Sequence, residues 1–186
     1  MPASAAENIQ IAAADGDLPA VQEFVLSGVK PDAGDFAGHT ALHAAASYGH
    51  EAVLSWLLAQ AGHEGAAAVD ADGDTPLHVC ESAPCATLLL EAAARAAPSA
   101  FDALAATNGA GETPYVVAVR ERRAAVADVL RAAYAARGAE PPLVDASLLD
   151  GSGDEDDDDD GGGDDADEAE VLAALAAQQQ QGQQQD

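Results

Sequence analysis

One short segment returns along this chain at nearly constant spacing, and this regularity restricts the folds that the chain can adopt. The sequence Thr-Ala-Leu-His at residues 40–43 comes back as Thr-Pro-Leu-His at residues 75–78, 35 positions later. A third copy begins at Thr113, a further 38 positions on, with tyrosine and valine in place of the leucine and histidine. Upstream, the residues before Gly16 match those before Gly49, 33 positions later. A period of this length predicts a solenoid of stacked repeats.

Each full copy begins with residues that favour the start of a helix. The threonine hydroxyl can accept a hydrogen bond from a free N–H group in the first helical turn, and Pro76 and Pro114 follow where a missing N–H group costs nothing. Small residues then let helices approach closely, and Gly49 permits a turn between two antiparallel helices. The apolar run at residues 53–58 predicts a second helix, which needs the next repeat to bury its face.

These motifs resemble the ankyrin repeat, in which Thr-Pro-Leu-His is followed by small residues, a glycine turn and a second apolar helix. The resemblance covers residues 8–137 and implies an all-α solenoid of about four helix-turn-helix repeats with hairpin-like finger loops. It also implies that His43 and His78 form hydrogen bonds between neighbouring repeats. The first repeat lacks Thr-Pro-Leu-His, as expected of a terminal repeat whose outer face meets water.

The third repeat departs from the regular spacing. The threonine precedes the second-helix leucine by 17 residues in the second and fourth repeats, but Thr75 precedes Leu89 by only 14. About three residues, nearly one helical turn, are missing. Because Pro84 falls where the glycine between the two helices belongs, we expect a short first helix that ends near Ser82.

Acidic residues dominate the charge of the chain. We divide it into an ankyrin domain at residues 7–137, a linker at 138–150 and an acidic, glutamine-rich tail at 151–186, which we expect to be disordered. Residues 1–150 have 20 acidic and 7 basic residues, net −13, and residues 151–186 have 13 acidic and no basic ones, also −13. Phosphate backbones and anionic lipids repel such a chain. We therefore expect a basic protein partner and no direct binding to nucleic acid or membranes.

The few basic residues gather in one repeat. Five of the seven lie in the fourth: Arg120, Arg122, Arg123, Arg131 and Arg137. We expect solvated cations near helix ends, where the helix dipole favours them. The alternative is a docking site for the acidic tail of the same chain.

No pattern in the sequence indicates catalysis, a cofactor or a metal site, so we do not expect an enzyme. Residues 70–81 imitate the offsets of a calcium loop, but Thr75 stands where that loop needs glycine. Cys80 and Cys85 lack the second pair of ligands that a zinc site needs, and we expect both to be structural, buried thiols. With no secretory signal or long apolar span in the sequence, a cytoplasmic or nuclear location is expected.

The candidate partner-binding residues lie on the finger loops and are carboxylates with one aromatic side chain. They are Asp32, Asp35, Phe36, Asp70, Asp72, Asp74 and Glu112. Carboxylates on one ridge can pair with arginine side chains through two parallel hydrogen bonds, or can simply be solvated. For Phe36, packing beside the adjacent finger is the simpler expectation, and for Trp56 it is packing in the core. Tail residues expected to screen the cations of a partner are Asp154, Glu155, Asp156, Asp157, Asp158, Asp159 and Asp160.

The overall layout, a short ankyrin stack followed by an acidic extension, is similar to that of small fungal ankyrin chaperones that hold a newly made ribosomal protein. The similarity implies a non-catalytic interaction module that escorts a highly basic protein; we expect the free chain to be a monomer. The alternative is a signalling or transcriptional adaptor whose partner has ordinary charge, with a tail that aids solubility. Salt should weaken binding steeply only in the first case.

Overall fold

The structure is a computed structural model that describes residues 5–95 and 102–144, all of which belong to one contact unit. Its helices are α1 (Ala5–Ala14), α2 (Leu18–Leu26), α3 (Ala41–Ser47), α4 (Glu51–Ala66), α5 (Ala83–Ala94), α6 (Pro114–Arg120) and α7 (Ala124–Ala136). Over these residues the backbone forms no strand beyond an isolated bridge between Gly34 and Thr40. The expected all-α solenoid is confirmed.

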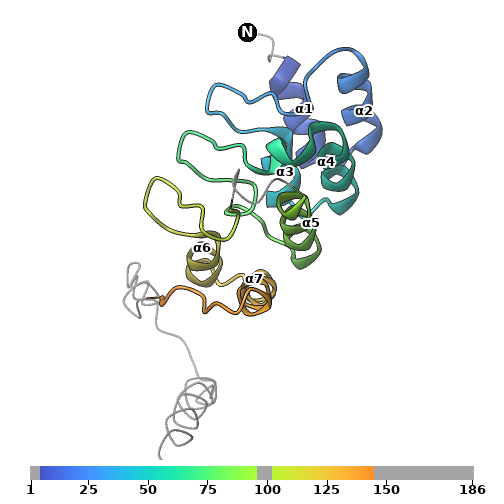
Figure 1. Cartoon of the computed structure of the whole chain (residues 1–186). Helices are drawn as coiled ribbons and strands as arrows, with labels where there is room; N and C mark the ends of the chain where they lie inside the picture. The colour runs from blue at the N-terminus through green and yellow to red at the C-terminus, as the bar shows by residue number, and fades with distance from the viewer. Residues whose placement is uncertain (1–4, 96–101, 145–186) are drawn as a thin grey trace, which may run out of the picture. The chain divides into compact units, whose positions relative to one another are not determined.

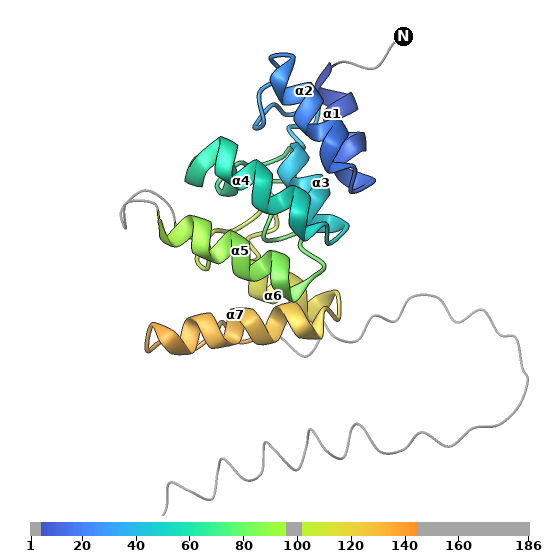
Figure 2. The ribbon, with the colours of Figure 1, turned by 90° about the vertical axis from the view of Figure 1, so that its right-hand side faces the viewer.

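The helices pair within repeats and stack between them. Within repeats α1 contacts α2, α3 contacts α4 and α6 contacts α7; between repeats α1 contacts α3, and α5 contacts both α4 and α7. Figure 2 shows α4, α5 and α7 running side by side as an outer layer. Three finger loops project on the same side of the helices, one ahead of α3, one ahead of α5 and one ahead of α6 (Figure 1).

The helix starts and inter-helix turns follow the sequence pattern. Thr40 and Thr113 are N-caps whose hydroxyls each accept a hydrogen bond from an N–H group in the first turn. Gly16 and Gly49 adopt φ angles of +73° and +71° between the paired helices, a conformation that glycine adopts without strain. In the fourth repeat Arg122 occupies this position with φ +57°, so a residue with a Cβ atom holds a left-handed conformation there.

The third repeat has no inner helix. Residues 76–78 form a turn, and the chain stays non-helical as far as Ser82, whose hydroxyl accepts a hydrogen bond from the Cys85 N–H at 3.3 Å and caps α5. The expected short helix ending near Ser82 is therefore wrong. Pro84 lies in the first turn of α5, where its ring is tolerated. With three residues missing, the segment is too short for a helix and a turn, and the Glu81 N–H instead bonds to the carbonyl of Ala46 at 3.1 Å.

Arg123, from the fourth repeat, supports this non-helical segment. Its Nη1 donates a hydrogen bond to the carbonyl oxygen of His78 at 2.8 Å, and its Nε lies 2.8 Å from a carboxylate oxygen of Glu81. The Arg123 side chain is only 17% exposed. The guanidinium group thus donates a hydrogen bond to a carbonyl oxygen that would accept one from a helical N–H group if the inner helix were complete.

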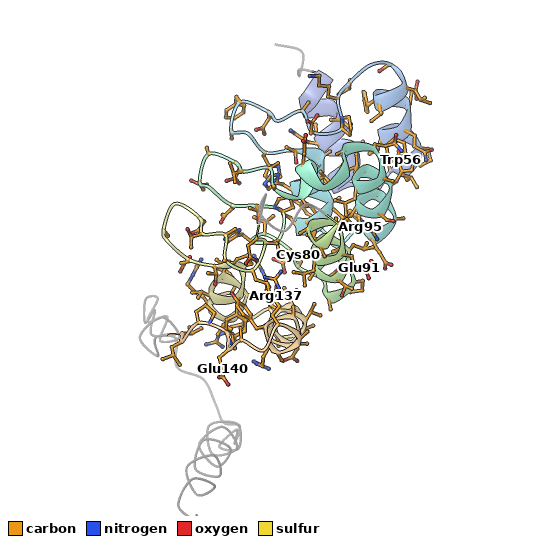
Figure 3. The ribbon with its side chains drawn as sticks, viewed as in Figure 1. Trp56, Cys80, Glu91, Arg95, Arg137 and Glu140 are labelled. Carbon is orange, nitrogen blue, oxygen red and sulfur yellow. The ribbon has the colours of Figure 1, made fainter. Side chains whose placement is uncertain are left out.

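The core is continuous through the stack and consists mainly of leucine and alanine. Its fully buried leucines are Leu42, Leu54, Leu57, Leu89, Leu104 and Leu130. Trp56 is partly buried and packs against this core, as expected. Cys80 (Figure 3) and Cys85 are free and buried, and desolvation raises the pKa of the Cys80 thiol to about 12. Both cysteines are therefore structural thiols in this environment.

Candidate functional site

One side chain at the base of each finger holds the loop in shape. In the first finger Asp35 Oδ1 accepts hydrogen bonds from the N–H groups of Ala37 and His39 at 2.8 and 3.0 Å. Asp70 accepts the corresponding pair in the second finger, and Asn108 in the third. Such side-chain turns fix the loop backbone. Asn108 was not among the sequence candidates, although it follows Asp70 by the same 38 residues that separate the threonines.

Backbone hydrogen bonds join neighbouring fingers directly. The Ala71 N–H donates to the carbonyl oxygen of Ala37, and the Gly109 N–H donates to that of Asp72, both at 2.7 Å. These bonds tie each fingertip to the next along the stack. The three fingers therefore form one ordered ridge (Figure 1).

Glycines bring the fingers so close that no side chain fits between them. A Cβ atom on Gly38 would lie 3.2 Å from the Asp70 Cα, and one on Gly73 would lie 2.8 Å from the Gly109 nitrogen. Phe36 consequently projects outward and is 95% exposed. The expectation that it packs beside the adjacent finger is wrong, because that contact is made by backbone atoms.

Buried polar side chains connect the repeats beneath the fingers. The Nε2 atoms of His43 and His78 lie 3.0 and 3.1 Å from the carbonyl oxygens of Asp74 and Glu112, one repeat further on. These bonds confirm the inter-repeat role that the resemblance implies. Gln10 donates from its Nε2 to the carbonyl oxygen of residue 39 in the same way. Sequence reasoning missed this third member, because glutamine replaces histidine in the first repeat.

Each of these histidines also bonds to the threonine three residues before it, and this fixes which ring nitrogen carries the proton. The Nδ1 atoms of His43 and His78 accept hydrogen bonds from the N–H groups of Thr40 and Thr75 at 3.2 and 3.1 Å. The Nε2 atoms must then carry the proton that is donated to the next repeat. Burial lowers the pKa of both rings, which keeps them neutral.

Besides Asp35 and Asp70, two more of the candidate carboxylates are engaged within the domain. The Glu112 carboxylate pairs with the Arg120 guanidinium through two hydrogen bonds of 3.0 and 3.1 Å, which raise the pKa of that arginine. Asp74 Oδ1 accepts a hydrogen bond from the Asn108 amide at 2.9 Å. Asp32 and Asp72, in contrast, are exposed and form no ion pair with any described residue. Asp72 therefore has the most accessible candidate carboxylate on the second finger.

Local ion pairs occupy most of the arginines. Among the described residues five of the six arginines form them: Arg95 with Glu91, Arg120 with Glu112 and Glu121, Arg123 with Glu81, Arg131 with Asp128, and Arg137 with Asp102. The residues labelled in Figure 3 include the Arg95 and Glu91 pair at the C-terminal end of α5. These basic groups are thus partly neutralised by their own domain, rather than simply solvated.

The remaining charge is unevenly distributed. Residues 5–95 have 13 acidic and 2 basic residues, net −11, while residues 102–144 have 5 of each and are neutral overall. The excess negative charge of the described part therefore lies in the first three repeats. The tail candidates at residues 154–160 lie outside the residues that the structure describes.

The described ranges contain neither a metal-binding cluster nor a membrane-spanning helix. No group of three or more His, Cys, Asp or Glu side chains there could hold a metal ion. None of the helices at residues 5–95 and 102–144 is long and apolar enough to cross a membrane. The finger ridge and the inner helices beside it remain as the candidate surface.

Comparison with known proteins defines the class. The family model for ankyrin repeats in three copies matches residues 9–102, half of the chain, and the chain belongs to the ankyrin repeat family. It is 46% identical over 74 residues to the ankyrin repeat-containing protein P1E11.10 of Schizosaccharomyces pombe. This match covers 40% of the chain and 35% of that protein, so the chain spans about a third of the relative's length. Ankyrin repeats generally act as non-catalytic protein–protein interaction modules, and the family match indicates that this domain is a protein–protein interaction module.

Proposed function

We propose that this protein binds and escorts a strongly basic protein, such as a ribosomal protein, in the cytoplasm or nucleus. The observation that supports this is the uneven charge of the described domain, net −11 over residues 5–95 and zero over residues 102–144. Attraction of this size steers a cationic partner towards one part of the surface and repels nucleic acid. The negative charge of this domain thus matches the positive charge of the partner's rRNA-binding surface, which the domain would protect.

The escort has two parts with different tasks. The finger ridge grips a folded or extended portion of the partner, because its backbone is held by side-chain turns and by hydrogen bonds between fingers. The acidic run at residues 154–160 screens further cations of the partner and so limits aggregation. The free protein is a monomer in this proposal, since its own surface charge opposes self-association.

Affinity capture from cell extract tests the escort role. The full-length chain and a chain that ends at Asp150 are immobilised side by side and washed at low and high salt, and bound proteins are identified by mass spectrometry. We expect one basic ribosomal or chromatin protein, lost at high salt and reduced without the tail. A neutral partner retained equally by both chains at both salts would contradict the proposal.

That contrary result would favour an adaptor with a partner of ordinary charge. Two exposed apolar side chains on the inner helices give this alternative its support, since Ile11 on α1 is 57% exposed and Tyr48 at the C-terminal end of α3 is 67% exposed. A contact dominated by such side chains would resist salt.

A further inference from the structure

We infer that Phe36 and Asp72 form an arginine-binding site on two neighbouring fingertips, which selects arginine over lysine in an exposed segment of the partner. The inference rests on the proposed function in one respect, because it assumes that the partner is basic. It goes further in naming the side chain that is recognised and the residues that recognise it.

The backbone places these two residues on neighbouring fingertips that are joined by a hydrogen bond. Phe36 precedes Ala37, whose carbonyl oxygen accepts the hydrogen bond from the Ala71 N–H at 2.7 Å, and Asp72 follows Ala71 directly. Each of the two residues is therefore one position away from one end of the same inter-finger hydrogen bond. The aromatic ring and the carboxylate extend from adjacent tips of one ridge.

Both tips are held by backbone hydrogen bonds, but the side chains of Phe36 and Asp72 have no partner among the described residues. The Asp72 N–H donates to Asp70 Oδ1 at 3.0 Å, and the Asp72 carbonyl accepts from the Gly109 N–H at 2.7 Å. The Asp72 carboxylate makes no hydrogen bond to any described residue, and Phe36 is 95% exposed. A site held in place before binding loses little conformational freedom when it is occupied.

The aromatic ring and the carboxylate suit a guanidinium group better than a lysine ammonium or an apolar pocket. A planar guanidinium can stack on an aromatic face while its N–H groups form two parallel hydrogen bonds to a carboxylate. A lysine ammonium offers only a compact, strongly hydrated charge and cannot do both. An apolar pocket on the partner would accept Phe36, but it would have to accommodate a neighbouring desolvated carboxylate at considerable cost.

Binding of defined peptides to the full-length chain tests the site. Two fluorescent peptides of equal length and charge, one alternating arginine with glycine and one alternating lysine with glycine, are titrated by anisotropy at low salt. We expect the wild-type chain to prefer the arginine peptide. Phe36→Leu should weaken arginine binding roughly two- to fivefold and leave lysine binding unchanged, whereas Phe36→Trp should match or exceed wild type, since tryptophan is the best cation partner.

Two matched variants complete the test. Asp72→Asn should also reduce the preference for arginine, because the amide cannot accept two guanidinium N–H groups. Leu143→Ala removes a side chain that is 99% exposed outside the fingers and should change nothing. Because Phe36 and Leu143 are almost fully exposed, circular dichroism should give wild-type thermal midpoints for their variants.

The outcomes separate this site from the proposed function. Equal binding of both peptides, with every Phe36 variant like wild type, would overturn the arginine site and leave a basic partner in place. If Phe36→Leu weakened binding of both peptides equally, the arginine site would also be overturned, because the ring would then not distinguish arginine from lysine. If neither peptide bound at low salt, both the site and the preference for a basic partner would be refuted.

Discussion

Replacing Arg123 by alanine should destabilise the junction between the third and fourth repeats. The change removes a hydrogen bond of 2.8 Å from a charged donor to the His78 carbonyl and an ion pair with Glu81. Loss of such a hydrogen bond costs about 1.5–3 kcal/mol. Glu81 is 49% exposed, so the ion pair adds only about 0.5 kcal/mol. We predict a loss of about 2–3 kcal/mol in the free energy of unfolding.

Urea unfolding followed by circular dichroism measures this loss. In a thermal scan the same change should lower the midpoint by roughly 6–12 °C, taking about 3–4 °C per kcal/mol for a domain of this size. Arg131→Ala is the matched control, because its ion pair with Asp128 is exposed at both ends, 55% and 69%, and should contribute less than about 0.5 kcal/mol. If the two variants unfolded within about 0.5 kcal/mol of each other, Arg123 would not support the third repeat.

Three further predictions concern stability. Arg122→Gly should raise the free energy of unfolding by about 1 kcal/mol, because glycine adopts φ +57° without strain, and thermal unfolding would show this as a higher midpoint. Gly73→Ala should lower the free energy of unfolding in urea more than Gly111→Ala does. Both glycines have φ near +79°, but only a Cβ at position 73 would lie against a neighbouring finger. Equal losses in the two variants would mean that the contact between fingers does not contribute to stability. Stability should fall as the pH drops below 6.5, because burial lowers the folded-state pKa of His43 and His78 and the unfolded chain takes up protons first. Replacing both histidines by glutamine should reduce the change in the urea midpoint between pH 7.5 and 5.5. If the midpoint still fell with pH as in the wild type, these rings would be excluded as the cause.

Local sequence pattern was sufficient for the regular parts of the fold. The threonine caps, the inter-helix glycines and the two bridging histidines all follow from short motifs whose geometry repeats. The third repeat was misassigned because Pro84 was interpreted as a helix end. The segment Ser-Ala-Pro at residues 82–84 carries the opposite signal, an N-cap followed by proline in the first turn, and α5 begins there.

Long-range contacts set the limit of prediction from sequence. Arg123 lies 45 residues from the carbonyl that it satisfies, and no spacing rule connects the two. The exposure of Phe36 depends on glycine-mediated contact between fingers 35 residues apart, which a single sequence does not reveal. Likewise, the bidentate pairing of Glu112 with Arg120 removes one candidate carboxylate from the free surface.

The location of the partner-binding charge is tested most directly by comparing two double variants with equal change in net charge. Asp32→Asn with Asp72→Asn removes the two exposed carboxylates of the fingers, and Glu23→Gln with Glu64→Gln removes two exposed carboxylates on α2 and α4. Affinity for the captured partner, or for the arginine peptide, would be measured at low salt. We predict a roughly three- to tenfold loss in the finger variant and less than about twofold in the other. Equal losses in both would contradict a binding site on the fingers and would mean that overall charge alone attracts the partner.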